Sequence, residues 1–286
     1  MKMNIESTTE LNSGVKIPVI GLGTWQIEDR KTCENAVKWA LETGYIHIDT
    51  ALIYGNEKYV GNALHEYLEE TGRSRDDIFI TTKLWNDKHG YENAKKGLQT
   101  SLKNLRLDYV DLYLIHWPVP GRRVETWKAF EEMLKEGKTR AIGVSNFMKH
   151  HLAKLLPQVD IIPQINQIEF SPFLYLKELQ NYCEENGIRI EAYSPLTHGK
   201  KLENPVLKTI AERYSKSSAQ ILIRWGLQRH LIEIPKSSSR NHIIENAKVF
   251  DFEINPEDMK TLDNLDEGWR SMSSKDWHPT AERWIE

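Results

Sequence analysis

The stretch "GYIHIDTALIYGNEKYVGNALHEYL" at residues 44–68 reads as a strand, a loop and a helix in that order. Residues 45–48 are β-prone and follow a glycine, and the spacing of apolar residues from Glu57 onward predicts a helix. Asp49 stands at the end of the strand, and Tyr54 lies in the loop. A carboxylate at the rim of a buried strand with a phenol just beyond it indicates a candidate site at the carboxyl end of that strand.

The same strand-then-helix pattern recurs along the chain. Helical segments with an apolar stripe follow the runs, and three of them stop at Gly44, Gly72 and Gly137, where glycine can take the left-handed conformation that ends a helix. Eight such units in 286 residues predict a (β/α)8 TIM barrel. The eight apolar runs are "PVIGLGT", "YIHIDT", "IFITTK", "VDLYLIHW", "TRAIGVSN", "IPQINQIEF", "IRIEAYSP" and "LIEIPKS".

A doubly wound open sheet is the alternative fold. The stretch "GLGTWQ", which begins in the first run, has Gly21 and Gly23 but no third glycine that would open a dinucleotide-binding helix, so the barrel is favoured. Before it, "TTELNSGVKIPV" predicts an N-terminal β-hairpin that closes the barrel floor, with its turn at Asn12–Gly14. Because no linker or low-complexity tract interrupts the chain, residues 1–286 are expected to form one barrel domain.

Composition narrows the class of protein. The net charge of −3 gives no electrostatic reason for a nucleic acid or an anionic membrane as partner. The N-terminus has no apolar signal region, and no apolar run reaches membrane-spanning length, so a cytoplasmic protein is expected. Cys33 and Cys183 are expected to be reduced thiols. We also expect a monomer.

Four titratable residues follow three successive strands of the predicted barrel. Taken singly, each has an ordinary structural explanation. Asp49 could cap a loop and Lys83 could reach solvent. His116 could be a hydrogen-bonded core histidine, and Tyr54 an apolar ring whose hydroxyl reaches solvent. Together they stand at the carboxyl ends of neighbouring strands, where the active sites of barrels lie. We therefore expect one charged cluster in a partly desolvated mouth.

The chemistry of such a cluster suits carbonyl reduction. A tyrosine with its ordinary pKa of about 10 is a poor acid at neutral pH, and the ammonium of Lys83 is expected to lower that pKa. Asp49 would keep Lys83 charged, Tyr54 would donate a proton, and His116 would hold the carbonyl oxygen. Because no side chain donates hydride, a nicotinamide cofactor is required.

At this point the sequence resembles the aldo-keto reductase superfamily. The motifs that carry the resemblance are "GLGTWQ", "HIDTALIYGNE", "ITTKLWN", "LDYVDLYLIHWP", "AIGVSNF", "QINQIEF", "EAYSPL" and "IPKS…ENAKVFDFEI". The resemblance is strongest to the prokaryotic branch of small-aldehyde and ketone reductases, similar to 2,5-diketo-gluconate reductase and glyoxal reductase. It implies a (β/α)8 barrel that binds NADP(H) without a Rossmann motif, and a catalytic tetrad of Asp49, Tyr54, Lys83 and His116.

The resemblance also implies a set of cofactor contacts. Ser145, Asn146 and Gln167 would bind the nicotinamide carboxamide, and Tyr193 would stack on the nicotinamide ring. Lys236, Ser237 and Ser238, at the end of the eighth run, would hold the 2′-phosphate. These contacts imply that NADP(H) is preferred. His242 stands where the family usually has arginine, so the preference is expected to be weaker and NAD(H) to be usable. The implied cofactor-binding residues are Gly23, Thr24, Asp49, Ser145, Asn146, Gln167, Tyr193, Ser194, Pro195, Leu196, Ile234, Lys236, Ser237, Ser238, His242, Glu245 and Asn246.

Aromatic residues next to the rim positions predict the substrate pocket. The small-molecule carbonyl substrate is expected to contact Tyr54 and His116 and to be walled by Trp25, Trp85 and Trp117. The short segment at residues 194–207 and the brief tail predict an open pocket with broad specificity, and Trp277 of the tail could reach its mouth.

Three other interpretations remain open. In one, the barrel is an aldolase and Lys83 forms a Schiff base with the substrate. In another, His47, Asp49 and His116 bind a metal ion, but no later strand end supplies a further ligand, so no metal ion is expected. A cofactor-binding regulatory module with negligible turnover would use the same barrel. The intact tetrad favours an enzyme over that module.

Overall fold

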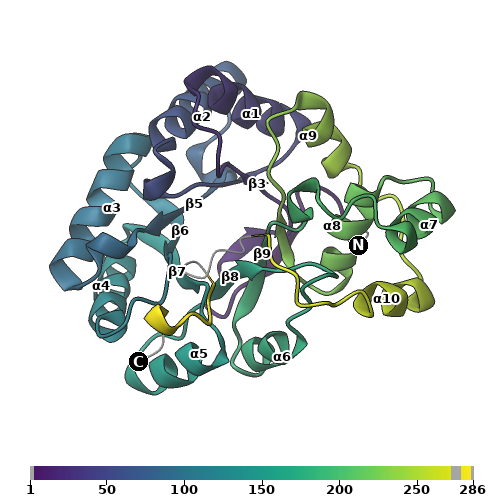
Figure 1. Ribbon diagram of the computed structural model, residues 1–286. Coiled ribbons are helices and arrows are strands. Elements are labelled where there is room, and N and C mark those ends of the chain that lie inside the picture. The colour runs from purple at the N-terminus through teal and green to yellow at the C-terminus, as the bar shows by residue number, and fades with distance from the viewer. Residues whose placement is uncertain (1–2, 272–277, 285–286) are drawn as a thin grey trace.

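The computed structural model describes residues 3–271 and 278–284. Its central sheet has eight parallel strands in the order β10-β9-β8-β7-β6-β5-β4-β3, and a ring of helices surrounds it (Figure 1). Each of the eight predicted runs overlaps one of these strands. They are β3 (Leu22–Gly23), β4 (His47–Asp49), β5 (Phe79–Leu84), β6 (Val110–Ile115), β7 (Thr139–Ser145), β8 (Ile165–Glu169), β9 (Arg189–Tyr193) and β10 (Ile232–Ile234).

Contacts between the first and last strands of the sheet close it into a barrel. Parallel bridges join Ile20 to Glu233 and Gly23 to Lys236. The backbone N–H of Gly21 donates to the carbonyl of Glu233 at 2.8 Å. The (β/α)8 barrel predicted from the sequence is therefore confirmed, and the open-sheet alternative is wrong.

The predicted hairpin is also present. Strands β1 (Thr8–Glu10) and β2 (Lys16–Pro18) pair antiparallel, and Gly14 in the turn has a φ of +83°, which glycine adopts without strain. Leu11 and Ile17 pack in one apolar cluster with residues of the barrel strands, among them Phe79 and Ile232, which stand at the beginning of β5 and β10. The hairpin therefore covers the amino-terminal end of the barrel and leaves the carboxyl ends of the strands open for a site.

Amphipathic helices form the outer layer because each buries one apolar stripe on the sheet. The first of them buries Ala36, Val37 and Leu41, and Gly44 ends it with a φ of +103° as expected. Between residues 3 and 271 and in 278–284, no helix is long and apolar enough to cross a membrane. The helices are α1 (Arg30–Thr43), α2 (Glu57–Thr71), α3 (Tyr91–Leu105), α4 (Arg123–Lys135), α5 (Lys149–Leu155), α6 (Lys177–Glu185), α7 (Pro205–Arg213), α8 (Ser218–Gln228), α9 (Arg240–Ala247) and α10 (Pro256–Asp263).

The close packing of α2 against the end of α3 predicts an asymmetric response to alanine. A Cβ at Gly61 would lie closer than 3.0 Å to backbone atoms of Leu105, whereas a Cβ at Gly97 would mainly meet the side-chain methyl of Leu84. Backbone cannot move aside as a side chain can, so we expect Gly61→Ala to destabilise the fold by about 1 to 3 kcal/mol despite the better helix propensity of alanine. Urea unfolding of both variants checks this. An equal or smaller loss for Gly61→Ala than for Gly97→Ala would contradict it.

Candidate active site

Lys83 lies at the centre of the site, at the carboxyl end of β5, and its side chain is 0% exposed. Its Nζ donates to Asp49 Oδ1 at 2.6 Å and to the carbonyl of Thr50 at 2.9 Å. The same nitrogen lies 3.4 Å from the hydroxyl of Tyr54. The structure therefore brings together three of the four residues predicted for the charged cluster, because β4 and β5 are adjacent strands.

The charges of this cluster follow from burial and pairing. Burial acts to lower the pKa of Lys83, but the charges of Asp49 and Tyr54 and the hydrogen bond to Asp49 outweigh it and raise the pKa above its ordinary value. Lys83 is therefore an ammonium at neutral pH, and it holds Asp49 in direct ion-pair contact. A buried ion pair of this kind is stable only with both partners present.

The structure corrects one expectation about Tyr54. Lys83 does act to lower the pKa of Tyr54, but burial raises it by more, so the net pKa lies above the ordinary value. The expected depression of the Tyr54 pKa is wrong, because the same enclosure that strengthens the Lys83 interaction also penalises the phenolate. Tyr54 is thus a neutral phenol that keeps its proton, which is the form a general acid requires.

Asn56 fixes the loop that carries Tyr54. The Thr50 hydroxyl donates to Asn56 Oδ1 at 2.7 Å, and Asn56 Nδ2 donates to the carbonyls of Thr24 at 2.9 Å and Ile27 at 3.2 Å. Asn56 is fully buried, so these bonds tie the loop to the turn after β3. The sequence analysis missed Asn56. The signal available was a polar amide two residues after Tyr54, just before a helix.

His116 completes the cluster from the residue after β6. Its ring lies edge-on to Tyr54 at 5.8 Å between centroids and edge-on to Trp85 at 5.1 Å. Burial, with the charge of Lys83, lowers the pKa of His116 well below the usual histidine value, so the ring is neutral. Its Nδ1 is buried with no hydrogen-bond partner in the described residues, which favours the tautomer with the proton on Nε2.

The polar residues at the ends of β7, β8 and β9 connect to this cluster. Asn146 Nδ2 donates to the carbonyl of His116 at 3.0 Å, and the Tyr193 hydroxyl donates to Asn146 Oδ1 at 2.8 Å. Gln167 Nε2 donates to Asp49 Oδ2 at 2.8 Å, and the Ser145 hydroxyl donates to the carbonyl of Gln167 at 2.9 Å. These expected cofactor residues thus share one hydrogen-bonded network with the tetrad.

A second group of expected cofactor residues lies at the end of β10 and along α9. Lys236, Ser238 and His242 are exposed, and Asn246 is buried. Lys236 pairs with Gly23 across the barrel seam, so this group begins beside the strand end that leads to Thr24. The other members are Ile234 (buried), Ser237 (8% exposed) and Glu245 (half-buried).

The segment after β9 links these two groups. Ser194 has a φ of +50°, which is uncommon for a residue other than glycine, and its hydroxyl lies 3.0 Å from Nε2 of His198. The ring of His198 lies 5.5 Å from that of Trp25. Pro195 is buried, and the half-buried Leu196 packs against the core. The segment is therefore held in a defined conformation beside the turn after β3.

Trp117, expected in the substrate wall, is covered by the end of the chain. The ring of Trp284 stacks on Trp117 at 5.1 Å between centroids, and both residues are buried. The carbonyl of Trp284 accepts hydrogen bonds from Arg123 Nη2 at 2.5 Å and from His151 Nε2 at 3.0 Å. The tail therefore contributes to this side of the mouth. Trp277 lies outside the described residues.

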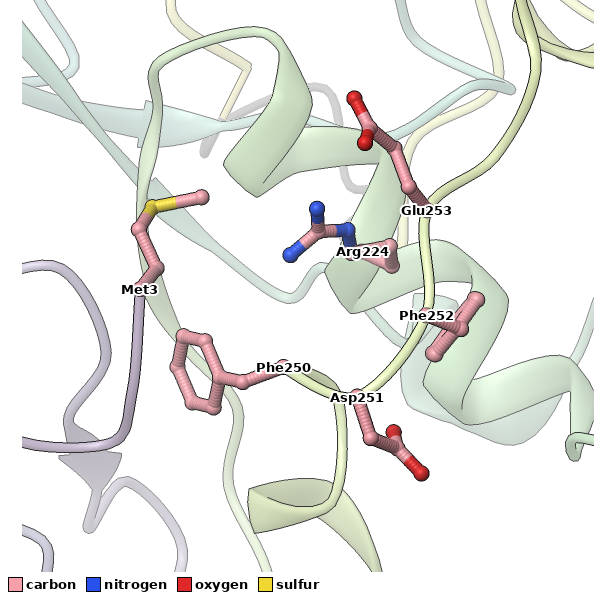
Figure 2. Close-up of a pocket in the computed structure, with 6 residues that line it drawn as sticks. All are labelled: Met3, Arg224, Phe250, Asp251, Phe252 and Glu253. Atoms are coloured by element: carbon pink, nitrogen blue, oxygen red, sulfur yellow. The ribbon is translucent and has the colours of Figure 1, made fainter. Parts of the chain in front are cut away.

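Two cavities lie outside the tetrad. One of about 520 Å³ lies between the tail and the segment after β9. Another of about 200 Å³ lies between α8 and the loop after α9, with Met3 and Phe250 on one side and the guanidinium of Arg224 pointing into it (Figure 2). Neither cavity is lined by a tetrad residue, so the hydrogen-bonded network and not cavity size locates the active site. Within residues 3–271 and 278–284, no three side chains of His, Cys, Asp or Glu gather as a metal-binding group.

Comparison with known proteins gives a consistent result. Residues 19–267 match the model of the Aldo/keto reductase family. The chain is 51% identical over 270 residues to the uncharacterized oxidoreductase YtbE of Bacillus subtilis, covering 94% of this chain and 96% of that protein. It is 47% identical over 270 residues to glyoxal reductase of the same organism, with the same coverage of 94% and 96%.

Solved structures agree with the sequence relatives. An aldo/keto reductase from Brucella melitensis superposes with a TM-score of 0.86 at 47% identity, covering 91% of this chain and 99% of that one. An aldo-keto reductase from Bombyx mori in complex with NADP superposes with a TM-score of 0.89 at 36% identity, covering 96% and 98%.

Removal of the buried ammonium gives a stability test of the site. In Lys83→Met, Asp49 stays buried without its counter-ion, so we expect the free energy of unfolding to fall by about 3 to 5 kcal/mol at pH 7. Lys83→Met/Asp49→Asn should recover much of this loss because no unpaired charge remains. Urea unfolding measures both variants. A Lys83→Met protein as stable as the wild type would show that the ion pair is not the constraint we describe.

Proposed function

The chain belongs to the aldo/keto reductase family, and we propose that it reduces small aldehydes and ketones to alcohols with NADPH, with Tyr54 as the proton donor. The observation that carries this proposal is the buried Lys83 ammonium in contact with both Asp49 and the Tyr54 hydroxyl. A neutral phenol beside a fixed cation can give up its proton to an oxygen that gains negative charge.

Each member of the tetrad has a separate role in this proposal. Tyr54 donates the proton. Lys83 stabilises the phenolate that forms as the proton leaves, and Asp49 keeps Lys83 charged and in place. His116 is neutral and 8% exposed, so its Nε2–H is suited to orient the carbonyl oxygen without adding charge.

The residues present fit a nicotinamide cofactor. When bound, NADPH supplies the hydride. The side-chain amide nitrogen of Gln167 donates to Asp49 and Glu191 inside the barrel. Its side-chain oxygen, Oε1, is left to accept from the carboxamide. Tyr193 is half-buried at the rim, where a ring can stack on the nicotinamide.

A phosphate group suits the other end of the proposed cofactor site. Lys236 supplies a positive charge, Ser237 and Ser238 supply hydroxyl donors, and the first turn of α9 supplies unpaired backbone N–H groups. The solved Bombyx mori relative that holds NADP supports the same assignment. The preference for NADP(H), with NAD(H) still usable, is part of this proposal.

The substrates are proposed to be small carbonyls, including 2-oxoaldehydes and diketones. The glyoxal reductase relative at 47% identity supports this class. Trp25 and Trp85 are half-buried around the mouth, while Trp117 is already stacked on Trp284. We therefore assign the apolar wall of the pocket to Trp25 and Trp85, and we assign the buried Trp117 a place behind that wall.

The competing function, a regulatory module that binds the cofactor with negligible turnover, predicts NADPH binding without loss of NADPH absorbance when aldehydes are added. The complete tetrad favours the enzyme. A monomeric state, a cytoplasmic location and a single domain over residues 1–286 stay predictions from the sequence.

The first test of the proposed function removes the proton donor. Tyr54→Phe keeps the ring and deletes the hydroxyl, so we expect kcat for carbonyl reduction to fall by at least about 100-fold. Cofactor binding, measured by fluorescence titration, should stay near normal. Tyr59→Phe is the matched control, because this half-buried tyrosine of α2 lies outside the hydrogen-bonded network of the tetrad. A Tyr54→Phe enzyme that retains half of the wild-type kcat would rule out the assignment.

The second test concerns cofactor choice. Each charge-assisted hydrogen bond is worth about 1.5 to 3 kcal/mol, so Lys236→Ala should reduce the preference for NADPH over NADH by about tenfold or more. His242→Arg should increase the preference, because arginine offers a fixed, bidentate donor to the 2′-phosphate. Lys248→Ala, at the opposite end of α9, is the control. Steady-state KM values for both cofactors measure the effect, and a preference unmoved by Lys236→Ala would place the 2′-phosphate elsewhere.

A further inference from the structure

Glu191 is a buried carboxyl that the proposed reaction does not use. It lies on β9 two residues before Tyr193, and it is fully buried. Gln167 Nε2 donates to Glu191 Oε2 at 2.6 Å and to Asp49 Oδ2 at 2.8 Å. A single amide therefore joins Glu191 to the carboxylate that holds Lys83.

The groups around Glu191 leave it without a counter-ion. From β4, His47 Nε2 lies 3.6 Å from Glu191 Oε1, but burial, with the charge of Lys83, lowers the pKa of His47 to about 3, so this ring is neutral. From β5, Lys83 faces the network but is paired with Asp49. From β8, Gln167 carries no charge.

The neighbouring strand β10 adds no charge to this side of the barrel. A Cβ on Gly226 of α8 would collide with the Glu233 carboxyl, so Glu233 faces the helix layer and not the interior. Burial raises the pKa of Glu233 well above its ordinary value. Glu233 is thus a second buried carboxyl that lies outside the network.

Burial first, and then the charge of Asp49, raise the pKa of Glu191 to about 8. The side chain therefore carries a proton at neutral pH. Its Oε2 accepts from Gln167, whereas its Oε1 has no hydrogen-bond partner in the described residues and faces the neutral His47. This leaves Oε1 as the oxygen that holds the proton.

We propose that Glu191 is a proton-holding positioning residue of the active site: as a neutral acid it lets Gln167 hold Asp49 against Lys83, and as an anion it opposes proton donation by Tyr54. The inference rests on the proposed role of Tyr54. Its physical basis is the charge count around Lys83. With Glu191 neutral, one carboxylate and one ammonium balance, and the phenolate that forms on Tyr54 shares the ammonium with Asp49 only.

Loss of the Glu191 proton would place a second carboxylate in the same dry network. That anion interacts unfavourably with Asp49 and with a phenolate on Tyr54. Proton transfer from Tyr54 to the substrate oxygen then becomes less favourable. Carbonyl reduction is therefore expected to fall as pH rises through the titration of Glu191.

The test is the pH profile of Glu191→Gln with NADPH and an aldehyde substrate. The amide that this substitution introduces would offer an oxygen to Gln167 and an N–H to His47, which imitates the protonated acid. For the wild type we expect kcat for reduction to fall about tenfold between pH 7 and pH 9, as one ionisation near pH 8 requires. For Glu191→Gln the ratio of the two rates should stay within about twofold. Glu233→Gln, the matched buried carboxyl outside the network, should show the wild-type fall.

Two readouts that need no activity accompany the profile. In infrared spectra at pH 7, the C=O stretch of a protonated carboxylic acid should be weaker in Glu191→Gln than in the wild type. In thermal unfolding, the folded pKa of about 8 lies above the usual 4.5, so wild-type stability falls as pH rises from about 4.5 to about 8. The melting temperature of Glu191→Gln relative to the wild type should rise over that window. The melting temperature of Glu233→Gln should rise relative to the wild type in the same way, because Glu233 is also a buried carboxyl with a raised pKa. The stability assay therefore tests protonation alone, and the rate profile tests the role of Glu191 in the active site.

The outcomes separate the two proposals. A wild-type rate that is flat from pH 7 to pH 9, or a fall that persists in Glu191→Gln, overturns the role of Glu191. An infrared signal at pH 7 that is the same with and without Glu191 overturns its protonation. Should Glu191→Gln fail to fold, the infrared titration of Glu233→Gln decides: between pH 7 and pH 9 its carboxylic signal must lose intensity in parallel with the rate, and a signal that does not change while the rate falls overturns the proposal. Failure of the Tyr54→Phe test, with the infrared result intact, would overturn the proposed acid and leave the protonated Glu191 standing.

Discussion

The rest of this active site depends on one fully buried ammonium. Lys83 is 0% exposed, so its charge must be met by Asp49 at 2.6 Å, by the carbonyl of Thr50 at 2.9 Å and by the hydroxyl of Tyr54 at 3.4 Å. Those contacts come from the end of β4 and the loop after it, so the charge fixes the register of β4 against β5. A shift of either strand by one residue would turn Lys83 or Asp49 to the other face of the sheet.

The burial that strengthens the interactions of the Lys83 charge also makes Tyr54 a weaker acid. Burial raises the pKa of Tyr54 by more than Lys83 lowers it, so the resting phenol stays neutral. The ammonium is therefore of most use when the proton is leaving, since its attraction is strongest for the phenolate that forms then. A site of this kind favours the transition state over the resting state, which is what catalysis needs. The neutral His116 fits the same arrangement, because a second cation there would compete for Asp49.

The sequence alone was sufficient to predict the repeated strand-and-helix units of the fold. Apolar runs of regular spacing predicted eight strands, and their order placed Asp49, Lys83 and His116 at neighbouring strand ends. Contacts made once, between residues far apart in the chain, leave no such pattern. Asn56 looks like an ordinary loop amide, and Glu191 is one acidic residue in an apolar strand. The stack of Trp284 on Trp117 joins residues separated by more than half of the chain. The pKa of Tyr54 was predicted with the wrong sign because burial and the Lys83 charge oppose each other, and only the structure says which is larger.

The tetrad and the walls of the substrate pocket are held by largely different contacts. The tetrad is held by β4, by β5, by the residue after β6, and by a loop that Asn56 ties to the turn after β3. Other segments cover the walls of the mouth. Trp25 contacts the segment after β9 through His198, and Trp117 is stacked under Trp284 of the tail, whose carbonyl accepts from Arg123 and His151. Substitutions in the tail or in the segment after β9 can therefore reshape the pocket without disturbing the Lys83 ion pair. The contacts that meet the Lys83 charge come from the end of β4 and the loop after it, whereas the tail and the segment after β9 make none of the contacts described for Lys83.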